Sequence, residues 1–260
     1  MRDNPKQFLR FASDDFTGYG IVKADRVWPI YGDIFGDYAI GDKSYDINQI
    51  KYLVPCKPQK IIAVGLNYAE HAAESTLPEI PEEPVLFFKP LSALIGHLEK
   101  IVIPSWVDRV DYEGELAVVI GQTLKNVSTG EAESGIFGYT CLNDVTARNI
   151  QRKDAQWTRA KGFDTFCPIG PIIVTSIDGS NLNIETRLNG LVVQSANTSL
   201  LIRKPAEIIS FISKVMTLYP GDILATGTPK GVGPLKVGDK IEVTIEAIGT
   251  LINNVTGGQA

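Results

Sequence analysis

Short runs of β-branched and other apolar residues, bounded by Gly or Pro, recur along the chain from residue 60 onwards. Such runs favour strands, because branched and aromatic side chains fit a pleated, half-buried surface. The segment 186–194 carries Asn189 and Gly190 between two of these runs, which predicts a hairpin with a type I′ turn. The other expected strands are residues 60–65, 85–89, 101–104, 115–121, 137–142, 171–175 and 222–226.

One segment shows the 3.6-residue period of a helix. Pro205 suits its first turn, where a backbone N–H has no partner within the helix. The pattern predicts a helix over residues 205–218 that packs on a sheet. The apolar positions that recur at helical spacing are Ile208, Ile209, Ile212, Val215 and Met216.

The first 57 residues differ from the rest of the chain. They hold short β-like pieces at 19–24 and 26–31, separated by Gly and Asp turns. Pro55 and Pro58 then keep the chain extended and remove two backbone donors, which marks a boundary. The sequence therefore predicts a small β-rich N-terminal domain over residues 1–57 and a main domain over 58–260. Strands outnumber helices throughout, so the expected class is mainly β (α+β).

Composition and charge argue against several classes of partner. The chain has 25 Lys and Arg against 30 Asp and Glu, and no basic run of the kind that binds a phosphate backbone, so no nucleic acid is expected. No stretch approaches the roughly 18 apolar residues that span a bilayer, so no membrane is expected. The first residues lack the apolar core of a signal peptide, and three scattered cysteines form no disulfide framework. We therefore expect a cytoplasmic protein.

Acidic residues open a strand that is otherwise apolar on both faces. Glu113 and Glu115 project to the same side of it, ~7 Å apart along the chain. Their repulsion is relieved by a shared proton, by a basic side chain or by a cation, and oxygen ligands favour magnesium, manganese or calcium. The alternative is a pair of surface residues at a frayed strand end. Asp144, after another apolar strand, supplies a third acid, although alone it would suit a helix cap or a turn.

A histidine and a glutamate follow the first strand of the main domain. Asn67 and Glu70 have the spacing of a capping box, which predicts that a helix begins there. In that helix His71 and Glu74 are three residues apart and face the same way, so the carboxylate can orient the imidazole as a general base. The alternative is an ordinary surface pair on a short helix.

Three further segments carry candidate binding groups. Arg148 and Gln151 lie one turn apart in a short helical segment after Asp144. The glycine-rich loop 226–233 matches no nucleotide-binding pattern, but its backbone and Thr228 could approach a small anion. Lys161 precedes an aromatic-rich turn, where it could meet a substrate carboxylate. The alternatives are an ordinary turn and a solvated lysine.

Taken in order, these segments resemble the fumarylacetoacetate hydrolase superfamily over roughly residues 60–255. The short chain and its small N-terminal segment are most similar to the compact bacterial members and the acylpyruvate hydrolases. The blocks that carry the resemblance are GLNYAEHAAE (65–74), FFKP (87–90), DYEGELAVVIG (111–121), NDVTARNIQ (143–151), KGFDTFCPIGP (161–171) and GDILATGTPKGVG (221–233).

The resemblance implies a mixed β-roll with a few short helices, assembled as a homodimer. It also implies one divalent cation, Mg²⁺ or Mn²⁺ with Ca²⁺ as a further option, and a small anionic oxo-acid substrate. By matching motif positions, the family's roles fall on Glu113, Glu115 and Asp144 for the metal, on His71, Glu74 and Lys161 for catalysis, and on Arg148, Gln151 and Thr228 for substrate binding.

The expected reaction is cleavage of a carbon–carbon bond beside an α-keto acid, by hydrolysis of an acylpyruvate or decarboxylation of oxaloacetate. The alternative within the family is an isomerase or hydratase of unsaturated 2-oxo dicarboxylates. Residues that separate these activities are expected in lid and pocket loops such as 75–83. A protein that kept the fold as a binding module is a third interpretation.

Overall fold

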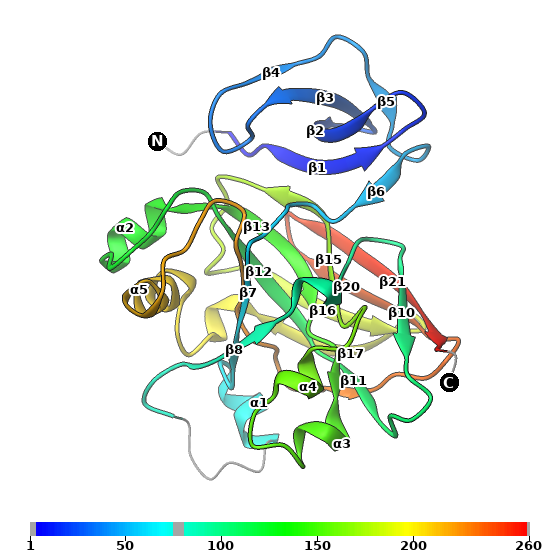
Figure 1. The fold of residues 1–260 in the computed structure, drawn as a ribbon, viewed down its shortest axis with the longest axis vertical. Helices are drawn as coiled ribbons and strands as arrows, with labels where there is room; N and C mark the ends of the chain where they lie inside the picture. The colour runs from blue at the N-terminus through cyan, green and yellow to red at the C-terminus, as the bar shows by residue number, and fades with distance from the viewer. Residues whose placement is uncertain (1–3, 75–80, 259–260) are drawn as a thin grey trace.

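The computed structural model describes residues 4–74 and 81–258, which form three sheets with a few short helices (Figure 1). The mainly β (α+β) class predicted from the sequence is confirmed. Along the largest sheet the strands are β4 (Tyr38–Ile40), β3 (Arg26–Gly32), β2 (Thr17–Lys23), β1 (Gln7–Ala12), β15 (Cys167–Val174), β13 (Ile136–Asn143), β12 (Gly114–Ile120), β18 (Ile223–Ala225), β7 (Ile61–Gly65) and β8 (Val85–Lys89).

The N-terminal strands gather at one end of the molecule, drawn in blue at the top of Figure 1. They include β5 (Tyr45–Asp46) and β6 (Lys51–Leu53), which pair with β3 and β1. Strand β1 also pairs with β15, with Phe8 opposite Ile173, so the sheet runs from this end into the rest of the molecule. The division at residue 57 stays a prediction.

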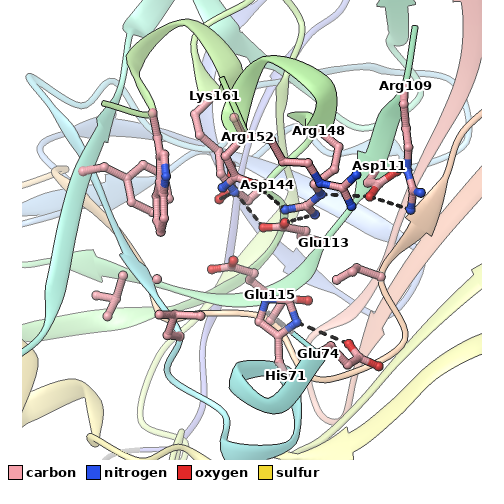
Figure 2. A pocket seen from close by; sticks show the side chains of 18 residues that line it. His71, Glu74, Arg109, Asp111, Glu113, Glu115, Asp144, Arg148, Arg152 and Lys161 are labelled. Atoms are coloured by element: carbon pink, nitrogen blue, oxygen red, sulfur yellow. Dashed lines mark hydrogen bonds and ion pairs between the residues drawn. The ribbon is translucent and has the colours of Figure 1, made fainter. Parts of the chain in front are cut away.

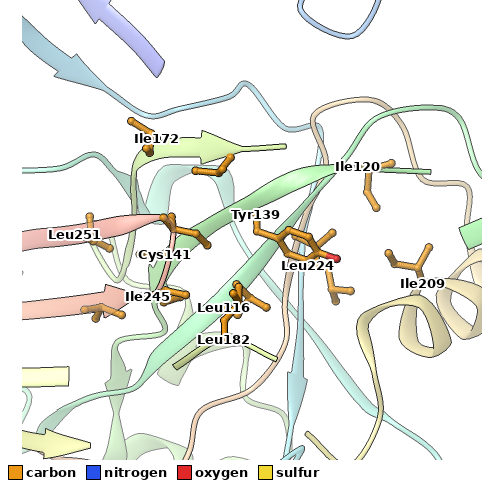
Figure 3. Close-up of a cluster of buried hydrophobic side chains, with 14 of the residues drawn as sticks. Leu116, Ile120, Tyr139, Cys141, Ile172, Leu182, Ile209, Leu224, Ile245 and Leu251 are labelled. Atoms are coloured by element: carbon orange, nitrogen blue, oxygen red, sulfur yellow. The ribbon is translucent and has the colours of Figure 1, made fainter. Parts of the chain in front are cut away.

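Strand β12 is the centre of the main sheet and is buried along its whole length. It pairs with β13 on one side and with β18 on the other, and β18 in turn pairs in parallel with β7. Its alternate side chains enter two different apolar clusters, one of which is shown in Figure 3 with Leu116 and Ile120. The acidic residues at its start are therefore attached to a strand that is buried at every position and paired on both sides.

Helix α5 (Pro205–Val215) covers one side of this core and begins at Pro205, as predicted. It ends three residues earlier than expected, because Met216 is extended and Leu218 exchanges backbone hydrogen bonds with Leu124. Val215, which the pattern placed on the apolar face, is 64% exposed.

Two smaller sheets complete the fold. The predicted hairpin is β16 (Asn183–Leu188) and β17 (Leu191–Asn197), and both turn residues have the positive φ expected, 52° at Asn189 and 82° at Gly190. They join a sheet with β20 (Lys240–Ile245), β21 (Gly249–Gly257) and β10 (Lys100–Ile103). The third sheet holds β11 (Val110–Tyr112), β14 (Thr146–Ala147) and β19 (Gly233–Pro234). Among the described residues, none of the helices has the length and apolar character needed to cross a bilayer.

His97 stabilises the packing between β6 and β21. Its Nδ1 accepts the backbone N–H of Ile252 (3.1 Å), and its ring meets Tyr52 edge-on with centroids 4.9 Å apart. Burial lowers the pKa of His97 to about 4. The imidazole is therefore neutral at pH 7 and serves the fold.

We expect this burial to make the protein less stable in acid. The unfolded chain binds the proton of His97 near pH 6.5 and the folded protein only near pH 4, so the free energy of unfolding falls as pH is lowered through that window. His97→Gln, which keeps an acceptor for Ile252, should flatten the slope by up to about 1.4 kcal/mol per pH unit. Denaturant unfolding from pH 7 to 4.5 measures it, and equal slopes in both proteins would contradict the assignment.

Candidate active site

Three carboxylates converge at the start of β12. Glu113, Glu115 and Asp144 are all buried, and each offers an oxygen within 4.8 Å of the others. The pairing of β12 with β13 brings this about, because Gly114 lies opposite Asn143 and the Asp144 N–H donates to the Glu113 carbonyl (2.8 Å). The structure thus brings together the three acids that the sequence predicted as one site.

Buried cations neutralise two of these acids. Lys161 Nζ donates to Glu113 Oε2 (2.7 Å) and to Asp144 Oδ2 (2.6 Å). Lys89 Nζ donates to Asp144 Oδ1 (2.5 Å) and to the carbonyl of Lys161 (2.7 Å). Arg148 adds an ion pair with Glu113.

Glu115 forms no ion pair with any described residue, and its hydrogen bond comes from the Gly227 backbone N–H (2.7 Å). Burial, followed by repulsion from Asp144 and Glu113, raises the pKa of Glu115 well above its usual range. Burial also opposes ionisation of Glu113, but Lys161 and Arg148 outweigh it and lower that pKa. Glu115 is therefore the one acid of the three that no lysine or arginine among the described residues contacts.

This donor set fits a hard divalent cation. Carboxylate oxygens are the ligands that magnesium, manganese and calcium prefer. A cation beside Glu115 would offset the repulsion from Asp144 and Glu113 that helps to raise the pKa of Glu115. A further hydrogen bond to Glu115 would leave that repulsion in place. The three acids are therefore the described residues best suited to bind a metal.

A fourth acid, Asp111, holds two arginines beside this cluster. Asp111 is buried and accepts Nε of Arg148 (2.9 Å) and, in a bidentate pair, Nε and Nη2 of Arg109 (2.7 and 3.1 Å). Arg148 Nη1 also donates to Gln151 Oε1 (2.6 Å), within helix α3 (Arg148–Gln151). Arg148 and Gln151 lie one turn apart, as predicted, and the NH₂ group of Gln151 has no hydrogen-bond partner among the described residues.

The backbone between the two glutamates is clamped from both sides. Gly114 N–H donates to Gln194 Oε1 (3.0 Å), and Thr228 Oγ1 donates to the Gly114 carbonyl (2.9 Å). Gln194 Nε2 in turn donates to Thr228 Oγ1 (2.8 Å). The hydroxyl of Thr228, predicted to bind substrate, therefore serves first to hold the strand that carries the acids.

His71 and Glu74 lie on helix α1 (Ala69–Glu74), with Nδ1 and Oε2 3.5 Å apart. Within the described part of the chain, His71 Nδ1 has no hydrogen-bond partner. Glu74 also accepts the Gly231 backbone N–H at 3.2 Å, which ties the helix to the glycine-rich loop. The pair is therefore in place but loosely joined.

The predicted capping box at the start of this helix is wrong. The helix begins at Ala69, and the side chain of Asn67 binds elsewhere: its Nδ2 donates to the Arg203 and Thr226 carbonyls (3.0 and 2.8 Å) and its Oδ1 accepts Arg203 N–H. Glu70 pairs instead with Lys230 (3.1 Å). Asn67 is buried, and long-range partners compete successfully with the local cap.

One cavity of about 400 Å³ connects these groups. Figure 2 shows the basic side chains with Asp111, Glu113 and Asp144 along one wall, and His71 with Glu74 on the other side of Glu115. Phe87 and Trp157 add an apolar surface. All nine site residues predicted from the sequence line this cavity. Of the expected lid segment 75–83, residues 75–80 lie outside the part that the structure describes.

Comparison with known proteins identifies the family. The model of the fumarylacetoacetate (FAA) hydrolase C-terminal domain matches residues 60–256, and a second, Rv2993c-like N-terminal, matches residues 7–55. The chain belongs to the fumarylacetoacetate hydrolase family. The family resemblance stated from the sequence is confirmed.

Relatives of known name have several activities. The mitochondrial oxaloacetate tautomerase FAHD2A of Bos taurus is 43% identical over 80% of this chain and 70% of its own. The structure of 2-hydroxyhepta-2,4-diene-1,7-dioate isomerase from Mycobacterium marinum matches with a TM-score of 0.92 at 41% identity, covering 98% and 100% of the two chains. A fumarylacetoacetate hydrolase from Exiguobacterium antarcticum matches with a TM-score of 0.87 at 35% identity, covering 97% and 100%. This is thus an enzyme family whose members isomerise, tautomerise or hydrolyse.

Several residues of this site were not predicted from the sequence. Lys89 could have been recognised as a candidate site residue, because it is a lysine at the end of an apolar strand within the FFKP block. Asp111 begins the DYEGELAVVIG block, but no role was predicted for it. Gln194 had no signal, because only the tertiary fold brings it to β12. The backbone of the loop that contains Gly227 was expected to approach a small anion, and its N–H donates instead to the carboxylate of Glu115.

Gly114 should not tolerate a side chain. A Cβ there would lie 2.2 Å from Thr186 Oγ1 and 3.3 Å from Gln194 Oε1. We expect Gly114→Ala to lower the free energy of unfolding by about 1–3 kcal/mol, as overpacking does, and to move both glutamates. Denaturant unfolding tests this. Gly130→Ala is the matched control, because Gly130 lies in helix α2 (Thr129–Ser134) with nothing within 4 Å of its Cβ, and equal losses would contradict the clamp.

Proposed function

We propose that this protein is a divalent-metal-dependent isomerase that moves a proton on a 2-oxo dicarboxylic acid, by keto–enol tautomerisation or by shifting a neighbouring double bond. The observation that carries the proposal is Glu115, a buried acid without a cationic partner among the described residues, in a cavity that His71 and Glu74 also line. The similarity to an oxaloacetate tautomerase and to a diene-dioate isomerase supports the type of reaction and the class of substrate.

The metal in this proposal is Mg²⁺ or Mn²⁺, with Ca²⁺ as a further option, held by Glu113, Glu115 and Asp144. When bound, it supplies Lewis-acid stabilisation of negative charge on the oxygens of the oxo acid. Lys161 lies against two of these acids, and its ammonium is 5.0 Å from the centre of the Phe87 ring. The ammonium of Lys161 would also stabilise negative charge that develops on the substrate oxygens beside these acids. Phe87 limits the access of water there.

Proton transfer is the task of His71 in this proposal. Its imidazole takes a proton from the carbon beside the oxo group, and Glu74 stabilises the imidazolium that results. The same proton returns to the oxo oxygen or to a carbon further along the chain, so one C–H bond is exchanged for an O–H or another C–H bond. The NH₂ group of Gln151 would help to orient the substrate.

Cleavage of a carbon–carbon bond is the second candidate. His71 and Glu74 could activate water instead of moving a substrate proton, and the similarity to a fumarylacetoacetate hydrolase supports this. Hydrolysis or decarboxylation was the first choice from the sequence. We rank isomerisation first, because the named tautomerase and isomerase are 43% and 41% identical and the hydrolase 35%.

The products formed by the purified protein separate these candidates. With Mg²⁺ or Mn²⁺, we expect faster interconversion of enol and keto oxaloacetate, followed by ultraviolet absorbance, without release of pyruvate. A chelator should stop this reaction and lower the melting temperature, and added Mn²⁺ should restore both. Pyruvate or carbon dioxide as the main product would favour cleavage. Bound metal without turnover of any oxo acid would favour a binding protein.

His71→Ala should remove the proton acceptor and little else. Loss of a general base costs about two to four decades in rate, so we expect the tautomerisation rate to fall about 10²- to 10⁴-fold. The rise in melting temperature on adding Mn²⁺ should be unchanged, because His71 is not among the three acids. His97→Gln controls for loss of a histidine elsewhere and should keep the rate. A loss of less than about tenfold for His71→Ala would exclude this role.

A further inference from the structure

Arg148, the arginine predicted to bind substrate, uses all three of its side-chain nitrogens in hydrogen bonds to the protein. Its Nε donates to Asp111, its Nη1 to Gln151 and its Nη2 to Glu113. Two of those bonds join the guanidinium to the buried acids Asp111 and Glu113, whose charges already balance its own. Arg148 is therefore better described as a positioning residue for Glu113 and Asp111.

Arg152 differs from the other arginines that line the cavity. It follows Arg148 by one turn, its backbone N–H donating to the Arg148 carbonyl (3.3 Å), and its side chain reaches the same cavity (Figure 2). Arg109 is held in a bidentate pair by Asp111. Arg152 has no ion pair or side-chain hydrogen bond with any residue that the structure describes. Its guanidinium is thus available to an anionic ligand.

Two aromatic side chains, Phe87 and Trp157, give the same cavity an apolar surface. Trp157 packs edge-on against Phe87 with ring centroids 5.2 Å apart. Gly65 makes room for it, because a Cβ at that position would lie 2.6 Å from Trp157 Cζ3. The cavity, at about 400 Å³, is within the size range of ligand pockets, roughly 300–1,000 Å³. A carbon chain longer than that of oxaloacetate therefore has an apolar surface to follow.

We infer that Arg152 is a specificity-determining residue that binds the distal carboxylate of an extended 2-oxo dicarboxylic acid, whose carbon chain lies against Trp157. This rests on the proposed function and narrows its substrate class. The 2-oxo carboxylate end would bind beside the metal that Glu113, Glu115 and Asp144 would hold, and the second carboxylate would accept charge-assisted hydrogen bonds from the guanidinium of Arg152. Arg152 and Trp157 stand at the two ends of the segment between α3 and α4 (Thr158–Lys161), so this segment would select the substrate.

Binding of a matched ligand pair tests this inference without turnover. With the Mn²⁺-loaded protein, titration calorimetry compares 2-oxoadipate with its distal monomethyl ester, in which a methyl group replaces the second charge. We expect the wild type to bind the diacid about tenfold more tightly, as hydrogen bonds to a charged group allow. Arg152→Gln should bring this ratio close to one. Arg159→Gln is the matched control, because Arg159 is an exposed arginine on α4 whose partner is Asp154 and which does not line the cavity.

The results that would contradict the role of Arg152 differ from those that would contradict the proposed reaction. An Arg152→Gln protein that keeps the preference, or that loses affinity for both ligands equally, overturns the inference, as does a wild type without any preference. A wild type that prefers the diacid through Arg152 but isomerises no oxo acid leaves the inference standing and refutes the proposed reaction. An unchanged melting temperature of Arg152→Gln confirms that the variant is folded.

Discussion

The site depends on the burial of three like charges at the start of one strand. Glu113, Glu115 and Asp144 lie close enough to repel one another strongly in a medium from which water is excluded. Lys161, Lys89 and Arg148 relieve most of that repulsion, and each of them is itself buried or partly buried. Glu115 has no cationic partner among the described residues, so it is the acid of the cluster whose ionised form a metal ion would stabilise most.

Such an arrangement requires a rigid backbone, which the fold supplies. Strand β12 is buried along its length and paired on both sides, and Gln194 and Thr228 bond to the peptide between the glutamates. Because the strand cannot relax outward, the acids cannot separate to escape their repulsion. Core packing thereby offsets the unfavourable free energy of keeping three acids close together, as is common at functional sites.

The sequence predicted local features well and their long-range partners poorly. Strand β8 was predicted with its observed bounds, and the Asn189-Gly190 turn with its conformation, because both depend on neighbouring residues. Strand β20 was missed, although its buried positions alternate with half-buried ones. The three acids were predicted by their chemistry and by family resemblance. Their clamp was not, because Gln194 reaches Gly114 only after two sheets have packed together.

The glycine-rich loop 226–233 has contacts on both sides of the cavity. Gly227 donates to Glu115, and Gly231 donates to Glu74 on the helix that carries His71. An insertion or deletion in this loop would therefore displace the acidic cluster and the base together. Evolutionary divergence of activity within such a scaffold should consequently avoid changes of loop length here and accumulate instead in segments that touch only the ligand.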